Sequence, residues 1–132
     1  MTVEYRACHR FARIAPRKAQ PVMDLIRGMP VSAALDLLRN DNHRASALVQ
    51  KVLASAIANA CNQNQDVRPN RLVVSQAHVN GGPLLFGRLR YRPTAMGRAL
   101  PFRRRTCHLH VRVADPGVAA PVAAAPGQAE EN

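Results

Sequence analysis

Seven arginines lie between Arg88 and Arg105, in the segment RLRYRPTAMGRALPFRRR, and this segment contains no acidic residue. The wider stretch from Val67 to Ala114 holds ten arginines and neither Asp nor Glu. Charges of one sign at this density repel each other unless an anion neutralises them. The forked guanidinium group of arginine matches phosphate oxygens especially well. The pattern therefore predicts that this segment binds a polyphosphate, that is, nucleic acid.

The same segment has the pattern of a long hairpin. Arg88, Arg90 and Arg92 alternate with apolar residues, and a period of two places their guanidinium groups on one face of an extended strand. Two prolines then flank a short centre in which Gly97 can take the positive φ of a tight reversal. We expect a hairpin over about residues 83–105, held in its working shape by a partner, because a long two-stranded ribbon is marginal in water.

Simple dimensions predict how far this hairpin reaches. About 14 residues on the outgoing side, at ~3.3 Å each, span roughly 45 Å. A compact body of about 80 residues is on the order of 30 Å across. The hairpin is therefore expected to project further than the body is wide.

Length and charge limit the rest of the chain. The 132 residues suffice for one domain, expected over residues 1–115, and the Ala/Pro-rich residues 116–132 are expected to be disordered. Net charge is +11 overall and +13 over residues 1–115, because two of the eight acids lie in the tail. Three widely spaced cysteines, without a signal peptide or a long apolar stretch, predict a cytoplasmic protein with reduced thiols and no membrane segment.

Apolar spacing predicts three helices. The first runs from Pro16 towards Gly28, and Pro21 is expected to kink it or to delay its start. A second helix opens at Pro30, and a third, the clearest, follows the polar residues 40–43. Their predicted apolar faces are Ala19, Val22, Leu25 and Ile26; then Val31, Ala34, Leu35 and Leu38; then Ala45, Leu48, Val49, Val52, Leu53, Ala56, Ile57 and Ala60.

Three stretches are predicted as strands: residues 5–14, 71–79 and 106–113. The last alternates cleanly, with Cys107, Leu109, Val111 and Val113 on one face, which indicates that this face is buried. The second and third strands flank the arginine-rich segment, so that segment should extend a central hairpin of the body. The predicted fold is α+β, with three helices packed on a small antiparallel sheet and a long protruding β-hairpin.

Other chemistries are less well supported. Cys107, His108 and His110 suggest zinc, but on a strand the thiol points away from both imidazoles and no CxxC pair exists. No nucleophile and base are paired and no phosphate-binding glycine loop is present, so we predict neither an enzyme nor a cofactor. The second and third helices could form a helix-turn-helix, but the apolar stripe on the third helix favours a core element.

Several ordered blocks resemble one family. Arg10–Ile14 with Pro16–Lys18, then Asp24–Gly28, are similar to the opening of bacterial large-ribosomal-subunit protein twenty-two. Later blocks of that family are resembled in the same order by Val52-Leu53, Ser55–Ala60, Val79, Gly82-Pro83, Arg90–Pro93, Ala95–Ala99, Arg104–Thr106 and His108. The resemblance covers roughly residues 5–115.

This resemblance implies a structural protein that stabilises 23S rRNA during assembly and reaches the nascent-peptide exit tunnel. Its partners would be 23S rRNA, neighbouring large-subunit proteins and the nascent peptide. Neither membrane binding nor a homo-oligomer is expected. From the charge pattern and the resemblance together, we expect rRNA contacts at Arg13, Arg17, Lys18, Arg88, Arg90, Arg92, Arg98, Arg103, Arg104 and Arg105. The tunnel tip would be Thr94, Ala95, Met96, Gly97 and Arg98.

Two alternatives to this ribosomal role remain at this point. The first is an architectural protein that inserts its β-ribbon into duplex DNA. The second is a hydrolase whose site the sequence does not reveal. Competition between duplex DNA and large-subunit RNA would separate DNA architecture from rRNA binding.

Overall fold

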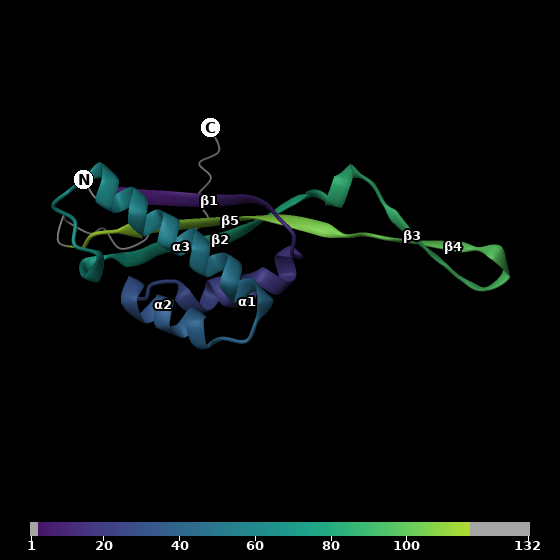
Figure 1. Cartoon of the computed structure of the whole chain (residues 1–132), viewed down its shortest axis with the longest axis horizontal. Helices are drawn as coiled ribbons and strands as arrows, with labels where there is room; N and C mark the ends of the chain where they lie inside the picture. Colours follow the sequence, from purple (N-terminus) through teal and green to yellow (C-terminus); the bar gives the residue numbers. More distant parts are fainter. Residues whose placement is uncertain (1–2, 117–132) are drawn as a thin grey trace, which may run out of the picture.

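The computed structural model describes residues 3–116, which form a three-stranded sheet, three helices and a two-stranded arm (Figure 1). In chain order the elements are β1 (Glu4–Ala12), α1 (Pro16–Ile26), α2 (Val31–Asn40), α3 (Arg44–Gln63), β2 (Val73–Leu84), β3 (Arg90–Pro93), β4 (Ala99–Phe102) and β5 (Arg105–Ala114). This is the predicted α+β architecture. Of the predicted disordered tail, residues 117–132 lie outside the described part of the chain.

The sheet has the strand order β1-β5-β2, and both neighbours run antiparallel to β5. The strict alternation predicted for the third strand is confirmed, since its four inward residues are all fully buried: Cys107, Leu109, Val111 and Val113. Burial raises the pKa of the Cys107 thiol, which keeps it protonated and unreactive. The central strand therefore supplies the middle of the hydrophobic core.

Helices α1 and α3 contact the sheet, and α2 packs against α3. The predicted stripes on α2 and α3 are confirmed, with Leu35, Leu48 and Ile57 partly buried and the remaining members buried. On α1 the prediction was wrong for one residue of the apolar face: Leu25 is 50% exposed, and Met23 is buried instead. Met23 lies four residues after Ala19 and so continues its stripe, whereas Leu25 points to another side of the helix.

Pro21 does not delay the start of α1, which begins at Pro16 and continues through to Ile26. Four side chains on this helix are buried against the rest of the body: Ala19, Val22, Met23 and Ile26. Their burial stabilises the helix despite the hydrogen bond that Pro21 cannot make.

The strand predicted at residues 71–79 starts later and ends later than expected. Residues Pro69–Arg71 form a 3₁₀ turn, and β2 begins at Val73, where backbone hydrogen bonds join it to the α1–α2 connection. Pairing with β5 then continues past Pro83 to Leu84. An edge strand tolerates proline, because one side of its backbone has no partner strand to which it must donate.

Beyond the sheet, β2 and β5 continue into the arm, which extends away from the body (Figure 1). A 3₁₀ turn at Leu85–Gly87 interrupts the outgoing side, after which β3 pairs with β4. The prediction that three arginines share one strand was therefore partly wrong: Arg90 and Arg92 lie on β3, but Arg88 precedes it. The interruption depends on positive φ at Phe86 and Gly87, which alternation of residue types does not reveal.

Gly82 lies where the arm leaves the sheet, and its lack of a side chain is required by close packing. A Cβ at Gly82 would lie 2.7 Å from Thr106 Oγ1 and 3.2 Å from the Thr106 backbone. Thr106 is buried and its hydroxyl donates to the Pro83 carbonyl, so it has little room to move. A methyl group at position 82 must therefore disturb the β2–β5 pairing.

We predict that Gly82→Ala lowers the free energy of unfolding by about 1–3 kcal/mol, the usual cost of overpacking. Gly81→Ala is the matched control, because a Cβ there meets nothing within 4 Å; its effect should stay within about 0.5 kcal/mol. Urea unfolding followed by circular dichroism measures both changes. Equal stability of the two variants would contradict the proposed clash.

Candidate nucleic-acid interface

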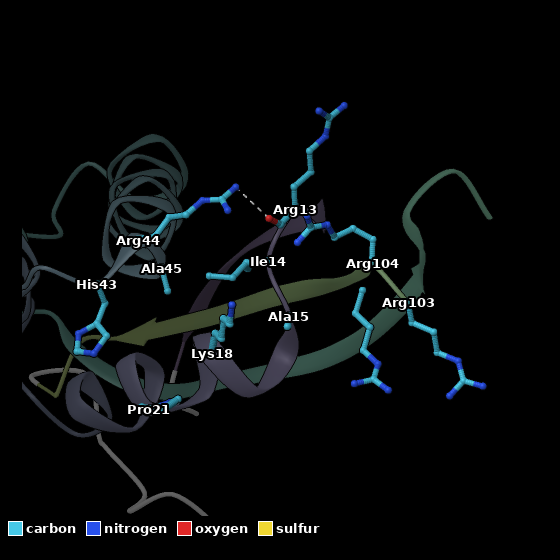
Figure 2. A pocket seen from close by; sticks show the side chains of 11 residues that line it. Arg13, Ile14, Ala15, Lys18, Pro21, His43, Arg44, Ala45, Arg103 and Arg104 are labelled. Carbon is cyan, nitrogen blue, oxygen red and sulfur yellow. Dashed lines mark hydrogen bonds between the residues drawn. The ribbon is translucent and has the colours of Figure 1, made fainter. Parts of the chain in front are cut away.

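A hollow of about 480 Å³ lies at the joint between the body and the arm (Figure 2). Three separate parts of the chain line it: the β1–α1 connection with the start of α1, the start of α3, and the returning side of the arm. Six of the lining residues are basic and none is acidic. The lining residues are Arg13, Ile14, Ala15, Lys18, Pro21, His43, Arg44, Ala45, Arg103, Arg104 and Arg105.

Three contacts hold these parts together: two hydrogen bonds and one contact between a guanidinium group and the ring of Phe86. The Arg44 guanidinium donates to the Arg13 carbonyl at 3.1 Å, joining the start of α3 to the β1–α1 connection (Figure 2). The Leu85 N–H donates to the Arg104 carbonyl at 2.8 Å, which closes the base of the arm. The Arg13 guanidinium carbon lies 6.0 Å from the centroid of the Phe86 ring. The joint is therefore a defined part of the fold.

Within residues 3–116, no acidic side chain lines this hollow. Four of the six acids in residues 1–115 pair with bases outside the hollow or with a histidine at its rim: Glu4 with Arg112, Asp24 with Arg27, Asp36 with Arg39, and Asp41 with His43. Cations gathered without acids favour an anion in the space between them. Of the chemical groups that nucleic acid offers, phosphate fits this hollow best.

Asp41 organises the rim of the hollow at the start of α3. Its carboxylate accepts hydrogen bonds from the Ser46 hydroxyl at 2.5 Å and from the His43 backbone N–H at 3.3 Å, and the His43 ring lies 2.6 Å away. The Ser46 and His43 hydrogen bonds hold the pKa of this carboxyl below its usual value. Asp41 thus holds the turn that precedes Arg44. Its carboxylate interacts with Ser46 and His43.

Along the arm, guanidinium groups of three arginines lie near two phenyl rings. The guanidinium of Arg90 lies 5.6 Å from the centroid of Phe86, and those of Arg92 and Arg104 lie 4.5 Å and 6.0 Å from the centroid of Phe102. Cation–π attraction of this kind favours a fixed guanidinium position. Local stacking therefore orders some of the arginines of the arm.

The predicted tip is a tight, exposed reversal. Thr94 donates to the Arg98 carbonyl from both its backbone N–H and its hydroxyl, each at 2.8 Å. Gly97 takes the positive φ that was predicted, 70°, but Met96 also does so, at 61°. Met96, the central residue of this reversal, is 94% exposed, so the tip presents an apolar side chain.

The structure brings together five of the ten residues predicted to contact rRNA and spreads the others. Arg13, Lys18 and Arg103–Arg105 line the joint hollow. Arg88, Arg90, Arg92 and Arg98 lie along the arm, and Arg17 lies in the first turn of α1. Nine of the ten are exposed and Arg90 is half-buried. All are therefore open to contact in the isolated chain.

Sequence reasoning missed Arg44, and it did not single out the open face of the sheet. Arg44 is the first residue of α3, where the helix dipole disfavours a cation, and that unfavourable position was the available signal. On the face of the sheet opposite to the core, a hollow of about 780 Å³ is lined partly by Arg6, Arg10, Arg112 and three histidines. A second basic surface therefore lies outside the predicted set.

The fold also bears on three other possibilities: DNA-groove recognition, metal binding and membrane spanning. Helix α3 is a core element, because seven of its residues are buried, so it cannot enter a DNA groove as a recognition helix. Within residues 3–116, no group of three or more His, Cys, Asp and Glu side chains is placed to hold a metal ion. No helix in that range is long and apolar enough to cross a membrane.

Comparison with known proteins agrees with the resemblance seen in the sequence. The profile of the family described as ribosomal protein L22p/L17e matches residues 7–114, which include both the body and the arm. The chain is also similar to the large ribosomal subunit protein uL22 of Solibacter usitatus (strain Ellin6076). The two are 43% identical over 113 residues, which cover 86% of this chain and 97% of the relative.

The matched region extends from β1 to the end of β5 and so spans nearly the whole described fold. The likeness is therefore not confined to a basic segment, which unrelated nucleic-acid-binding proteins could share. The chain belongs to the ribosomal protein L22p/L17e family: it is a structural, non-enzymatic protein of the large ribosomal subunit, a cytoplasmic particle of ribosomal RNA and protein in bacteria.

Proposed function

We propose that this protein binds 23S rRNA through arginine–phosphate contacts and stabilises the rRNA fold during assembly of the large subunit. The observation that carries the proposal is the joint hollow, where six bases and no acid converge from three parts of the chain. Such a site suits a point where RNA segments meet and their phosphates lie close together. Each phosphate that the bases neutralise releases counterions, and this release favours binding. Recognition would depend mainly on shape, since the deep major groove of RNA excludes side chains.

The arm would extend this interface into the interior of the subunit. Arg90 and Arg92 lie on β3, Arg98 and Arg103 flank β4, and the exposed tip consists of Thr94, Ala95, Met96, Gly97 and Arg98. We propose that the tip lines the nascent-peptide exit tunnel, with the nascent peptide as a passing partner. The apolar, uncharged side chain at the centre of the tip, Met96, would give a passing peptide no strong ionic contact.

The salt dependence of binding tests this proposal. If the protein neutralises about six phosphates in all, at the joint hollow and along the arm, log affinity against log salt for a 23S rRNA fragment should have a slope of roughly −4 to −5. We predict that Arg104→Gln makes this slope shallower by about 1. Filter binding or fluorescence anisotropy at several salt concentrations measures it.

Arg39→Gln is the matched control for this series. Arg39 is exposed on α2, pairs with Asp36 at 3.8 Å and does not line the hollow, so its removal should leave the slope unchanged. A slope near zero for the unmodified chain would contradict phosphate neutralisation. Equal affinity for duplex DNA in direct competition would instead favour the DNA-architecture alternative.

A further inference from the structure

Three residues other than glycine have positive φ within residues 3–116: Phe11 at 58°, Phe86 at 59° and Met96 at 61°. All three are large and apolar, and their side chains are 55%, 69% and 94% exposed. Bulky side chains seldom occupy the left-handed region, and they persist there only when the surrounding structure holds them. At these positions the fold therefore holds an apolar group outwards against the preference of the backbone.

Phe11 is the one of these residues that lies on the open face of the sheet. It sits where the pairing of β1 with β5 is irregular, between His9 and Ala12. Its backbone N–H donates to Nδ1 of His108 at 3.0 Å, and its ring meets the His108 ring edge to face at 5.1 Å. The Arg10 guanidinium carbon lies 5.5 Å from the ring centroid. These contacts fix the orientation of the ring.

The surroundings of Phe11 offer cations and hydrogen-bonding groups. The neighbouring hollow of about 780 Å³ is within the size range of small-ligand sites, and Arg10 and His108 line it together with Arg6 and Arg112. Glu4 pairs with Arg112 at 3.3 Å and partly neutralises it. Arg10 thus supplies positive charge beside the ring, and Arg6 adds positive charge further along the same hollow.

Two further imidazoles complete this surface. His78 and His110 are stacked with ring centroids 4.9 Å apart. Partial burial, reinforced by neighbouring cations and imidazoles, lowers the pKa of both below that of a free imidazole. Both rings are therefore neutral near pH 7, and each presents one donor and one acceptor nitrogen. Such groups can pair with the polar edge of a nucleobase.

We infer that Phe11 is a stacking platform for an unpaired RNA base, with Arg6 and Arg10 at the adjoining phosphates. Proteins bind single-stranded RNA by this combination of an exposed aromatic ring and flanking arginines. The inference rests on the proposed RNA-binding function and adds a second, single-strand-specific site to it. Phe86 is different, because two guanidinium groups lie near its ring, Arg13 at 6.0 Å and Arg90 at 5.6 Å, whereas only Arg10 lies near the ring of Phe11.

The chain contains no tryptophan, so Phe11→Trp would introduce a single fluorescent reporter at this site. Stacking of a base should quench its emission strongly when single-stranded oligouridylate is added to the full chain. Inorganic polyphosphate, which carries charge without bases, should quench it little, and so should duplex RNA. Leu25→Trp is the matched control: Leu25 is 50% exposed on α1, away from the sheet face, and its reporter should not respond.

A second variant separates stacking from folding. Phe11→Gly accepts the positive φ without strain, so the fold should be kept, while affinity for oligouridylate should fall roughly 10-fold. The salt slope should not change, because the arginines remain. If Phe11→Trp is not quenched, or if polyphosphate quenches it equally, the stacking site is refuted. The proposed rRNA contacts would fail separately, through a salt slope near zero for the unmodified chain.

Discussion

A variant in which a short glycine turn replaces residues 89–103 should unfold at the same temperature as the full chain and lose most of its RNA affinity. We expect a loss of roughly 1,000-fold or more for a 23S rRNA fragment at about 0.1 M salt. The deletion removes four arginines: Arg90, Arg92, Arg98 and Arg103. At about one released counterion per phosphate contact, the salt slope should become shallower by about 3 to 4.

The body should tolerate this deletion because β3 and β4 pair with each other and add little to the core. Within residues 3–116, every residue of the hydrophobic core lies outside the deleted segment. Differential scanning calorimetry measures the stability, and filter binding measures the affinity. A variant that keeps the arm but carries Gln at the same four positions is the control for charge. If either variant binds as tightly as the full chain, arginine neutralisation by the arm is excluded as the source of affinity.

Leu109→Ala should produce a large loss of stability. Leu109 lies on the central strand β5 and is fully buried. Removing a buried leucine side chain leaves a cavity and costs about 2–5 kcal/mol. That is a large part of the total stability of about 5–15 kcal/mol that a domain of this kind has. Chemical denaturation of the full chain gives the value directly.

Leu100→Ala is the matched control for this prediction. It is the same substitution on the arm, where Leu100 is 59% exposed on β4. Its effect on the free energy of unfolding should stay within about 0.5 kcal/mol. Comparable losses for Leu100→Ala and Leu109→Ala would mean that the arm contributes to the cooperative core. That result would contradict the conclusion that the arm adds little to the stability of the body.

Together these two experiments test whether the body and the arm of the chain are stabilised in different ways. The body is stabilised by apolar burial between the sheet and the helices, so it should fold without RNA. The arm has few apolar contacts; Arg–Phe stacking orders part of it, and we propose that anions bound by its arginines order the rest. Partner binding should therefore order the arm without changing the fold of the body.

Much of this organisation could be predicted from the sequence alone. The absence of acids between Val67 and Ala114 indicated a polyanionic partner, and the strict alternation in β5 indicated a one-sided sheet. The stripe on α3 indicated a core helix, and Gly97 indicated the turn at the tip. These features are legible because charge and hydrophobic period act locally, so that neighbouring residues along the chain contain the whole signal.

Only the tertiary structure decided which distant residues meet. Arg13, Arg44 and Arg104 line one hollow because the β1–α1 connection, the start of α3 and the base of the arm converge. The exposed, left-handed Phe11 depends on an irregularity in the pairing of β1 with β5, and His108 on β5 holds it. Periodicity states where a side chain points relative to its own backbone. Long-range register and packing determine what lies opposite, and no local pattern encodes them.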